Sequence, residues 1–310
     1  MAAHWTGVFP AVTTQMRKDE SIDFDATAQH IEVLIDSGIS GLIMLGSLGE
    51  NQVMDPAEKR KVVELGVKVA RGRIPVLCGV AETSVRIAKS YMDDTRDLGV
   101  DGYMIMPAMI YKADTREAVA YFRTLAAATK LPWMLYNNPV GYPVDITPAI
   151  LDTLSDVKNC VAVKESSADP RRITEIRNIS GDRFALFVGV DDLALETAIL
   201  GIDGWVAGAG IAFPAENQYF WELTRAGKWD EARKLYRWFQ PLLKLDTHIK
   251  FVQYLKLLVQ ETGLGKEWVR APKLILEGEE RERVLKIIHD GLAKRPKLPT
   301  SKTHEKVGAA

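Results

Sequence analysis

Hydrophobic positions in this chain gather into short continuous runs and do not alternate with polar ones. Eight such runs recur, and amphipathic segments of helical length separate them. Runs of this kind are typical of parallel strands that are covered on both faces. The predicted strands are 8–14, 41–46, 74–80, 102–107, 132–136, 160–164, 184–190 and 204–208.

Helix start signals lie between the predicted strands. Asp55, Pro56 and Glu58 combine an N-cap, a proline at the first helical position and a capping-box glutamate, and Asp114 with Glu117 repeats the box. Eight strand-then-helix units over about 225 residues predict a (β/α)8 TIM barrel. An open doubly wound sheet is the alternative, but it usually has fewer strands and a glycine-rich phosphate turn.

The pattern changes after the eighth predicted strand. Residues 214–263 carry aromatic and aliphatic side chains at helical spacing, and a further helix is predicted over 279–293. These helices exceed what one barrel unit requires. We therefore expect a catalytic barrel over 1–215, a C-terminal helical extension over 216–295 and a polar tail over 296–310 that is disordered at its end.

Composition narrows the possible partners. The chain has 310 residues, and its 40 Lys and Arg nearly balance its 41 Asp and Glu, so no net field attracts nucleic acid or an acidic membrane surface. No apolar run approaches the ~20 residues of a membrane helix. The N-terminus lacks the basic and apolar regions of a signal peptide, which favours a cytoplasmic protein. Cys78 and Cys160 lie in apolar runs, and we interpret them as reduced core residues.

The chain gives no sign of a metal or cofactor site. None of the five histidines lies near another histidine, a cysteine or an acidic pair at metal-ligand spacing. No G-x-G-x-x-G follows a predicted strand, and no phosphate-binding P-loop is present. We therefore expect no metal and no cofactor.

Catalytic groups of a TIM barrel lie at the C-terminal ends of its strands, where Lys164 stands out. It follows three apolar residues, so burial should favour its neutral amine, which can attack a carbonyl or imine carbon. The alternative is a structural ion pair with Glu165 or another carboxylate of the barrel. Lysines such as Lys59 and Lys61 lie in amphipathic segments and are expected to be solvated.

Two other strand ends could serve the same chemistry. Gly46 and Gly49 flank Ser47 and Leu48 after the second strand, and the backbone N–H groups of such a turn can hold a carboxylate. The alternative is a tight turn without a ligand. Tyr136 ends the fifth strand, where its phenol could transfer protons or serve only as a structural aromatic.

Three motifs together carry a family resemblance. Residues 46–50 fit G-x-x-G-E, residues 136–139 fit Y-N-x-P, and residues 164–166 fit K-[DE]-[ST]. In this order they resemble the dihydrodipicolinate synthase/N-acetylneuraminate lyase family of class I aldolases and lyases, over about residues 5–215. The resemblance implies that Lys164 forms a Schiff base, that Tyr136 shuttles protons, and that the protein is a homotetramer without a cofactor.

The chain departs from the synthases of this family at three places. They use two adjacent hydroxyl residues in the first loop, and here the second is Leu48. They have a tyrosine after the fourth strand, where residues 106–110 include Met109 and no tyrosine. Tyr111 is the nearest candidate for a tyrosine that completes the proton relay of a neighbouring subunit. They also carry an arginine after Y-N-x-P, and residues 140–143 contain none. These departures argue against lysine-pathway synthase activity.

The stretches 7–15, 107–114 and 136–142 most resemble Δ1-pyrroline-4-hydroxy-2-carboxylate deaminases, which form 2-oxoglutarate semialdehyde and ammonia. In that reaction Ser47 and the amides of residues 46–49 would hold the substrate carboxylate, and Gly189 would line the pocket.

Apolar Leu48 and Met109 suit a compact ring better than a polyhydroxy chain. Two enzyme alternatives remain: a dehydratase of 2-keto-3-deoxy sugar acids and an aldolase that releases pyruvate. A non-catalytic barrel that binds a small molecule and keeps an inert lysine is the alternative of another class.

Overall fold

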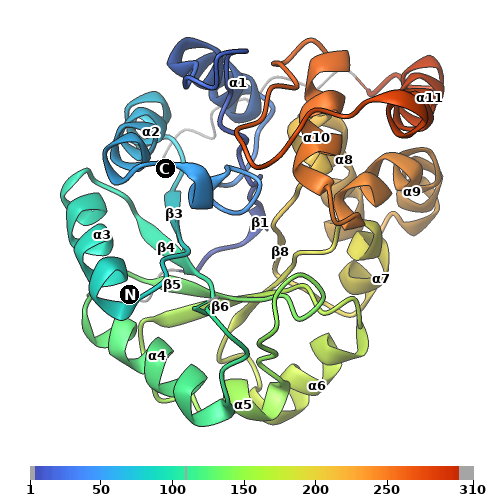
Figure 1. The fold of residues 1–310 in the computed structure, drawn as a ribbon. Helices are drawn as coiled ribbons and strands as arrows, with labels where there is room; N and C mark the ends of the chain where they lie inside the picture. Colours follow the sequence, from blue (N-terminus) through green and yellow to red (C-terminus); the bar gives the residue numbers. More distant parts are fainter. Residues whose placement is uncertain (1–3, 109, 300–310) are drawn as a thin grey trace, which may run out of the picture.

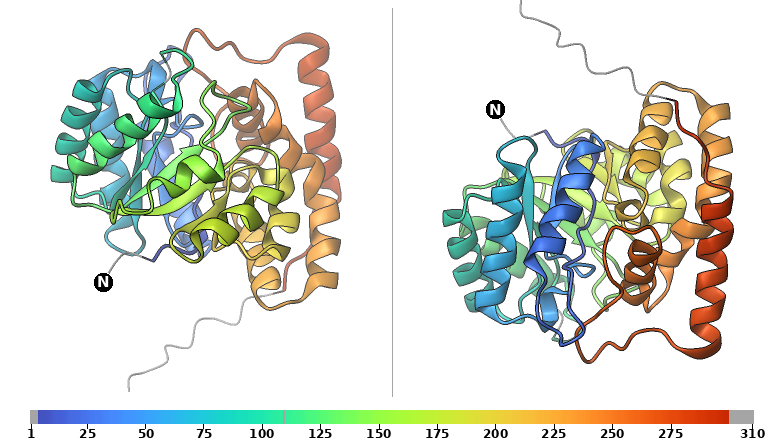
Figure 2. Two further views of the ribbon diagram at one scale, coloured as in Figure 1. Left: turned by 90° about the horizontal axis from the view of Figure 1, so that it is seen from below. Right: turned by 90° about the horizontal axis from the view of Figure 1, so that it is seen from above.

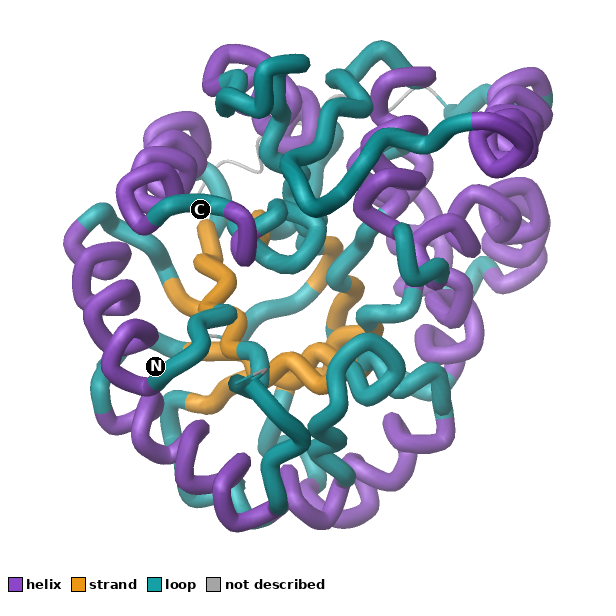
Figure 3. The backbone as a smooth tube through the Cα atoms, viewed as in Figure 1, coloured by secondary structure: helices purple, strands orange, loops and turns teal. Residues whose placement is uncertain are grey.

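The computed structural model describes residues 4–108 and 110–299, and its eight strands form one parallel ring. The strand order is β1-β8-β7-β6-β5-β4-β3-β2, and a parallel bridge between Ala11 and Ile43 closes the ring (Figures 1 and 3). Each predicted strand overlaps an observed one, which confirms the (β/α)8 TIM barrel. The strands are β1 (Gly7–Val8), β2 (Leu42–Met44), β3 (Val76–Val80), β4 (Gly102–Ile105), β5 (Trp133–Asn137), β6 (Cys160–Glu165), β7 (Ala185–Val188) and β8 (Gly204–Trp205).

Helices surround the strand ring on its outer side (Figure 1). Both predicted capping boxes are formed: the Asp55 amide donates to Glu58 at 3.0 Å, and the Glu117 amide donates to Asp114 at 2.8 Å. These local bonds fix where α2 and α4 begin. The helices of the ring are α1 (Phe24–Asp36), α2 (Pro56–Ala70), α3 (Val85–Asp97), α4 (Thr115–Ala127), α5 (Pro148–Asp152), α6 (Arg171–Ser180), α7 (Ala194–Ile199) and α8 (Pro214–Arg225).

A helical C-terminal part follows α8 and lies along one flank of the barrel (Figure 2). It comprises α9 (Trp229–Leu243), η4 (Lys244–Thr247), α10 (Phe251–Glu261) and α11 (Gly278–Ala293). Aromatic rings join it to the barrel, because Phe213 packs edge-on against Trp238 at 5.5 Å and against Phe239 at 5.8 Å. A division into two units at residue 215 stays a prediction, and most of the predicted tail lies outside the described residues.

Aromatic side chains fill the barrel interior below the strand ends. The rings of Phe9 and Phe187 meet edge to face with their centroids 5.3 Å apart. Glycines make room for them: a Cβ on Gly41 would lie 2.2 Å from the Phe9 ring, and one on Gly204 would lie 2.1 Å from the Phe187 ring. The barrel is thus a packed core and not a pore.

Cys78 and Cys160 are both free and buried, as predicted. The expectation for Lys59 is wrong: its side chain is buried and pairs with Glu82 at 2.7 Å. Its place on the inner side of α2 makes a partner necessary, because a buried ammonium is costly unless it is paired. No helix among the described residues is long and apolar enough to cross a membrane. The cytoplasmic location stays a prediction.

Candidate active site

Lys164 lies inside the barrel near the C-terminal end of β6. It pairs in register with Tyr136 on β5, and its Nζ lies 4.0 Å from the centre of the Tyr136 ring. Only 7% of the lysine is exposed. The next residue, Glu165, accepts hydrogen bonds from Asn137 at 3.1 Å and from the Ser167 amide at 2.6 Å. The alternative ion pair between Lys164 and Glu165 is not formed.

Burial determines the charge state of Lys164. Desolvation lowers the pKa of its amine, and the charges of Asp246, Tyr142 and Asp191 oppose that shift without reversing it. A lowered pKa raises the fraction of neutral amine, which is the form that attacks a carbonyl or imine carbon. The lysine predicted as the nucleophile therefore has the environment that such a nucleophile requires.

Gly189 directly follows β7 and shapes the space around the Lys164 side chain. A Cβ at this position would lie 2.4 Å from Lys164 Cε and 2.1 Å from Ser166 Oγ. Only glycine lets the lysine pass at this point. Ser166 is buried, and its hydroxyl has no hydrogen-bond partner within the described part of the chain. The sequence prediction included Gly189 and missed Ser166.

The phenol of Tyr136 is arranged as a proton donor. Asn138 donates a hydrogen bond from Nδ2 to the Tyr136 oxygen at 3.0 Å, which leaves the phenol hydrogen free. Burial raises the pKa of Tyr136 above its usual range, although the Asn138 bond opposes the shift. The group therefore stays protonated at neutral pH and can donate to a developing alkoxide beside Lys164.

The loop after β2 is shaped by close backbone contacts. A Cβ on Gly49 would lie 2.9 Å from Leu45 Cα, and a Cβ on Gly46 would lie 3.3 Å from Met104. Within the described residues, the amides of Ser47, Leu48 and Gly49 donate to no protein acceptor. Three free amides on one tight turn form a concavity suited to an anion. Leu48 itself is buried, with 3% of its surface exposed.

Tyr142 joins this loop from the segment that follows β5. Its hydroxyl contacts Ser47 Oγ, and its ring meets the Tyr136 ring edge to face at 5.9 Å. Burial raises the pKa of Tyr142. The sequence interpretation noted that residues 140–143 lack an arginine but did not recognise the tyrosine among them, because nothing local shows where a loop side chain points.

Glu50 ends the G-x-x-G-E motif and serves as its anchor. Its buried carboxylate accepts hydrogen bonds from Lys256 Nζ at 2.5 Å and from the Arg270 amide at 3.2 Å. Lys256 lies on α10 and is fully buried as well. The pair therefore ties the loop to the C-terminal helices and does not face a substrate.

Two carboxylates complete the surroundings of Lys164. Asp191, after β7, accepts hydrogen bonds from Trp205 Nε1 at 2.9 Å, the Gly208 amide at 3.0 Å and the Ala209 amide at 2.6 Å. Burial raises the pKa of Asp191 to about 6. Asp246 comes from η4, and its carboxylate lies against Gly208. Neither residue is among those predicted from the sequence.

Two further predictions concern the loop after β4. Met109, expected to contact the substrate, lies outside the described residues. Tyr111 is 58% exposed, and its hydroxyl donates to Glu117 at 2.7 Å. Within this chain, that hydroxyl is therefore bonded at the surface of the barrel. Among the described residues, no group of three or more His, Cys, Asp or Glu side chains could hold a metal ion.

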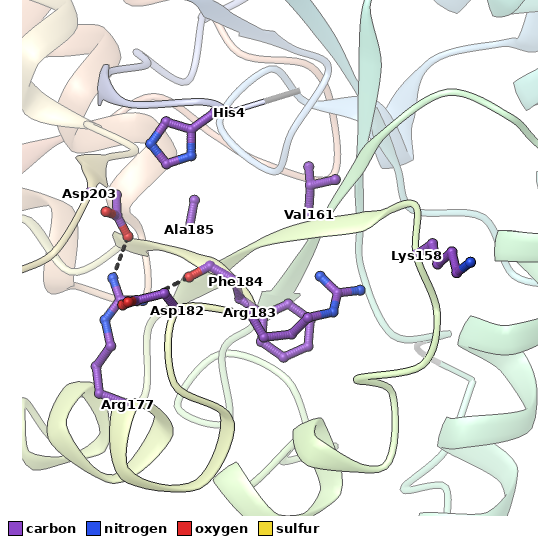
Figure 4. Close-up of a pocket in the computed structure, with 9 residues that line it drawn as sticks. All are labelled: His4, Lys158, Val161, Arg177, Asp182, Arg183, Phe184, Ala185 and Asp203. Atoms are coloured by element: carbon purple, nitrogen blue, oxygen red, sulfur yellow. Dashed lines mark hydrogen bonds and ion pairs between the residues drawn. The ribbon is translucent and has the colours of Figure 1, made fainter. Parts of the chain in front are cut away.

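A polar cavity of about 300 Å³ lies at the other end of the barrel, by the N-terminal ends of β6, β7 and β8 (Figure 4). Its arginines already have partners. Arg183 donates to three backbone carbonyls, those of Ser155, Val157 and Cys160. Arg177 pairs with Asp203 at 2.5 Å. Because the guanidinium donors of both arginines are bonded within the protein, we interpret the arginines of this cavity as structural and not catalytic.

Known proteins resemble the chain over nearly its whole length. A relative from Oceanobacillus iheyensis named 4-hydroxy-tetrahydrodipicolinate synthase is 27% identical over 285 residues, 91% of this chain and 96% of the relative. A protein of the same name from Methanococcus maripaludis strain C6 is 30% identical over 240 residues, 77% of this chain and 82% of the relative.

Solved structures agree. A putative dihydrodipicolinate synthetase from Pseudomonas aeruginosa matches with a TM-score of 0.87 at 26% identity, over 93% of this chain and 100% of that one. The prophage protein YagE from E. coli K12, solved in complex with pyruvate, matches with a TM-score of 0.86 at 26% identity, over 94% and 99%. The model of the dihydrodipicolinate synthetase family matches residues 4–290. The chain therefore belongs to the dihydrodipicolinate synthetase family, whose members are lyases that act through a lysine Schiff base.

Proposed function

We propose that this protein deaminates Δ1-pyrroline-4-hydroxy-2-carboxylate to 2-oxoglutarate semialdehyde and ammonia, with Lys164 as the nucleophile. The observation that carries the proposal is the contact between Tyr142 and Ser47. The segment that follows Y-N-x-P contributes an uncharged hydroxyl to the site, and residues 140–143 hold no arginine for the carboxylate of a second substrate. A single compact substrate with one carboxylate suits this arrangement.

Substrate binding begins at the loop after β2. The free amides of residues 47–49 and the Ser47 hydroxyl hold the carboxylate, since backbone N–H groups on a tight turn bind anions. Leu48 is buried in the apolar core at the position where a second hydroxyl residue would serve a more polar substrate. Gly189 leaves room for the ring beside Lys164.

The first chemical step opens the ring. The neutral Lys164 amine attacks the ring carbon that carries both the carboxylate and the C=N bond. The ring nitrogen then leaves as a primary amine, and the carbon becomes the lysine imine. Tyr136 donates the proton that the departing nitrogen requires, because its phenol hydrogen is free and its pKa is raised by burial.

The later steps remove the hydroxyl and the nitrogen. Loss of a proton next to the imine gives an enamine, which expels the 4-hydroxyl as water. Tautomerisation gives a terminal imine, whose hydrolysis releases ammonia, and hydrolysis of the lysine imine releases the product. One water is formed and two are consumed, so the overall reaction takes up one water. Tyr136, Tyr142 and Ser47 supply the hydroxyl groups that move protons within the site.

This reaction differs from the one in the names of the relatives. Those proteins are named synthases at 27–30% identity, and the family alone does not determine which 2-oxo acid a member uses. Leu48 and the segment 140–143 are the positions that support a different substrate here. The proposal therefore keeps the family's Schiff-base chemistry and changes what it acts on.

A product assay tests the proposal. The purified protein is incubated with Δ1-pyrroline-4-hydroxy-2-carboxylate, and ammonia and 2-oxoglutarate semialdehyde are quantified, with Lys164→Arg as the inactive control. Parallel samples contain 2-keto-3-deoxy sugar acids, and pyruvate with aspartate semialdehyde. Ammonia in a 1:1 ratio with the semialdehyde supports the deaminase. Dehydration of a sugar acid, pyruvate release, or condensation in the parallel samples without ammonia release would overturn it.

The proposal includes the homotetramer that the resemblance implies. Ile110 and Tyr111 are exposed hydrophobic residues beside an apolar cavity of about 270 Å³, which also supports an interface on this side of the barrel. Analytical ultracentrifugation should give four chains per particle. A monomer at micromolar concentration would contradict this part of the proposal.

A further inference from the structure

Asp246 reaches the active site from outside the barrel sequence. It lies on η4 of the C-terminal part, about 40 residues after the end of β8, and η4 packs against η2 (Asp191–Leu193). Its carboxylate lies so close to the Gly208 backbone that a Cβ there would be 2.3 Å from Oδ1 and 2.8 Å from Oδ2. Glycine at 208 is therefore what admits this side chain to the mouth of the barrel.

The position of Asp246 relative to the catalytic pair follows from packing: η4 lies against η2, which begins two residues after Gly189, the glycine beside the Lys164 side chain. Its charge acts on the pKa of Lys164 more strongly than any other charge does, and it also acts on Tyr136. Both residues are side chains that the Schiff-base reaction uses. Asp246 thus faces the space in which a substrate attached to Lys164 would lie.

Asp246 differs from its neighbour Asp191 in having no partner. Asp191 is held by three N–H donors, from Trp205, Gly208 and Ala209. The Asp246 carboxylate makes no hydrogen bond or ion pair with any described residue. A partly buried carboxyl group without a donor destabilises the folded protein unless it is protonated or meets a ligand. Its surroundings therefore suggest a functional role and not a structural one.

Burial favours the protonated form of Asp246. Burial raises the pKa of Asp246 well above its usual range, and the charge of Asp191 raises it further, whereas Lys164 opposes the shift. A carboxylic acid with a raised pKa keeps its proton to higher pH and can give it to a leaving group. The proposed reaction has one step that requires such an acid, the loss of the 4-hydroxyl.

We propose that Asp246 is the catalytic acid that protonates the departing 4-hydroxyl of the substrate. The inference rests on the proposed function. The enamine electron pair forms the new C3=C4 bond and restores the lysine imine, while the C4–O bond breaks. The oxygen takes the Asp246 proton and leaves as water, and Asp246 becomes a carboxylate that regains a proton from solvent. No oxidant or reductant is required.

The variant Asp246→Asn tests this step, because the amide keeps the shape of the side chain and cannot supply the proton. We expect ammonia release from the hydroxypyrroline to fall by about 10²- to 10⁴-fold. Borohydride trapping of pyruvate on Lys164 should be unchanged, and so should deuterium exchange into the pyruvate methyl group, since neither involves a leaving hydroxyl. Asp230→Asn, an exposed change on α9, is the matched control.

A second substrate separates acid catalysis from simple damage to the site. A 4-chloro analogue loses chloride, which needs no proton, so D246N should process it at a rate within about threefold of the wild-type rate. Asp246→Glu should restore part of the activity on the hydroxyl substrate. Equal losses on both substrates, or full activity of D246N on the hydroxyl substrate, would overturn the assignment. If the wild-type protein releases no ammonia, the proposed function fails, and this assignment fails with it.

Discussion

The two ends of the barrel differ in how some of their charged side chains are paired: two arginines at one end have partners, and a lysine and an aspartate at the other have none within the described part of the chain. At the N-terminal ends of the strands, Arg177 and Arg183 have their donors taken up by Asp203 and by backbone carbonyls (Figure 4). At the C-terminal ends, Lys164 and Asp246 have no ion-pair partner among the described residues.

A buried charge without a partner costs folding free energy, so it persists where something else requires it. The pairing of the arginines at the N-terminal end is explained by its contribution to folding stability. The C-terminal end contains the Lys164 amine, the Asp246 carboxyl group and the free amides of the loop after β2, which we propose find their partners in a bound substrate. Substitutions at one end of the barrel, compared with substitutions of matched residues elsewhere, can therefore test this difference.

The largest effect is expected from the lysines at the two ends. Lys164→Ala removes the nucleophile and should lower kcat/KM by at least about 10⁴-fold. Lys158→Ala removes a lysine that lines the opposite cavity and should leave kcat/KM within twofold of wild type. Steady-state assays of ammonia release compare the two. Equal losses in both variants would remove the distinction between the ends.

A lysine near the C-terminal ends of the strands that does have an ion-pair partner should contribute to the stability of the fold. Lys256→Met removes the fully buried partner of the Glu50 carboxylate and leaves it the more distant Lys273 at 3.6 Å, so it should lower the free energy of unfolding by about 3–5 kcal/mol. Lys250→Met breaks the half-exposed pair with Glu280 and should cost less than about 1 kcal/mol. Urea denaturation measures both, and similar values for the two pairs would contradict the anchoring role of Glu50.

Two tyrosines near the active end should also differ. Tyr136→Phe removes the phenol beside Lys164 and should lower kcat by about 10²- to 10⁴-fold without abolishing imine formation. Tyr111→Phe removes a rim hydroxyl that donates to Glu117 and should leave kcat nearly unchanged. A large loss in the Tyr111 variant would instead indicate that this residue enters the site of a neighbouring chain.

The smallest effect is expected from an arginine at the N-terminal end of the barrel, and it concerns stability. Arg183→Met deprives three backbone carbonyls of their donor and should lower the free energy of unfolding by about 1–3 kcal/mol, with kcat/KM unchanged. Arg171→Met, at a position that is 82% exposed, is the control and should change stability by less than about 0.5 kcal/mol. A loss of activity in the Arg183 variant would mean that this cavity takes part in function.

Much of this arrangement could be predicted because its determinants are local. Continuous apolar runs and capping boxes such as that of Asp114 identified strands and helix starts from neighbouring residues. The TIM-barrel rule then placed Lys164 and Tyr136 at the same end, since both conclude a strand. Gly189 became a site prediction through the family resemblance, and the structure shows the close approach that requires a glycine there.

The missed residues depend on long-range packing. Tyr142 contacts Ser47 through the path of a loop, and no pattern in 140–143 predicts that path. Asp246 meets Gly208 only because η4 packs on the barrel from the C-terminal part. Lys59 looked like a solvated helix lysine, but its partner Glu82 lies on the loop after β3. The order of helices and strands along the chain does not predict which distant segments come into contact.

Trapping with pyruvate and sodium borohydride at neutral pH, followed by peptide mass spectrometry, tests the central claim most directly. Burial lowers the pKa of Lys164, which raises the fraction of neutral amine that can form the imine. We expect one reduced adduct, on the peptide that contains Lys164. An adduct on Lys158 or another lysine, or no adduct at all, would contradict it.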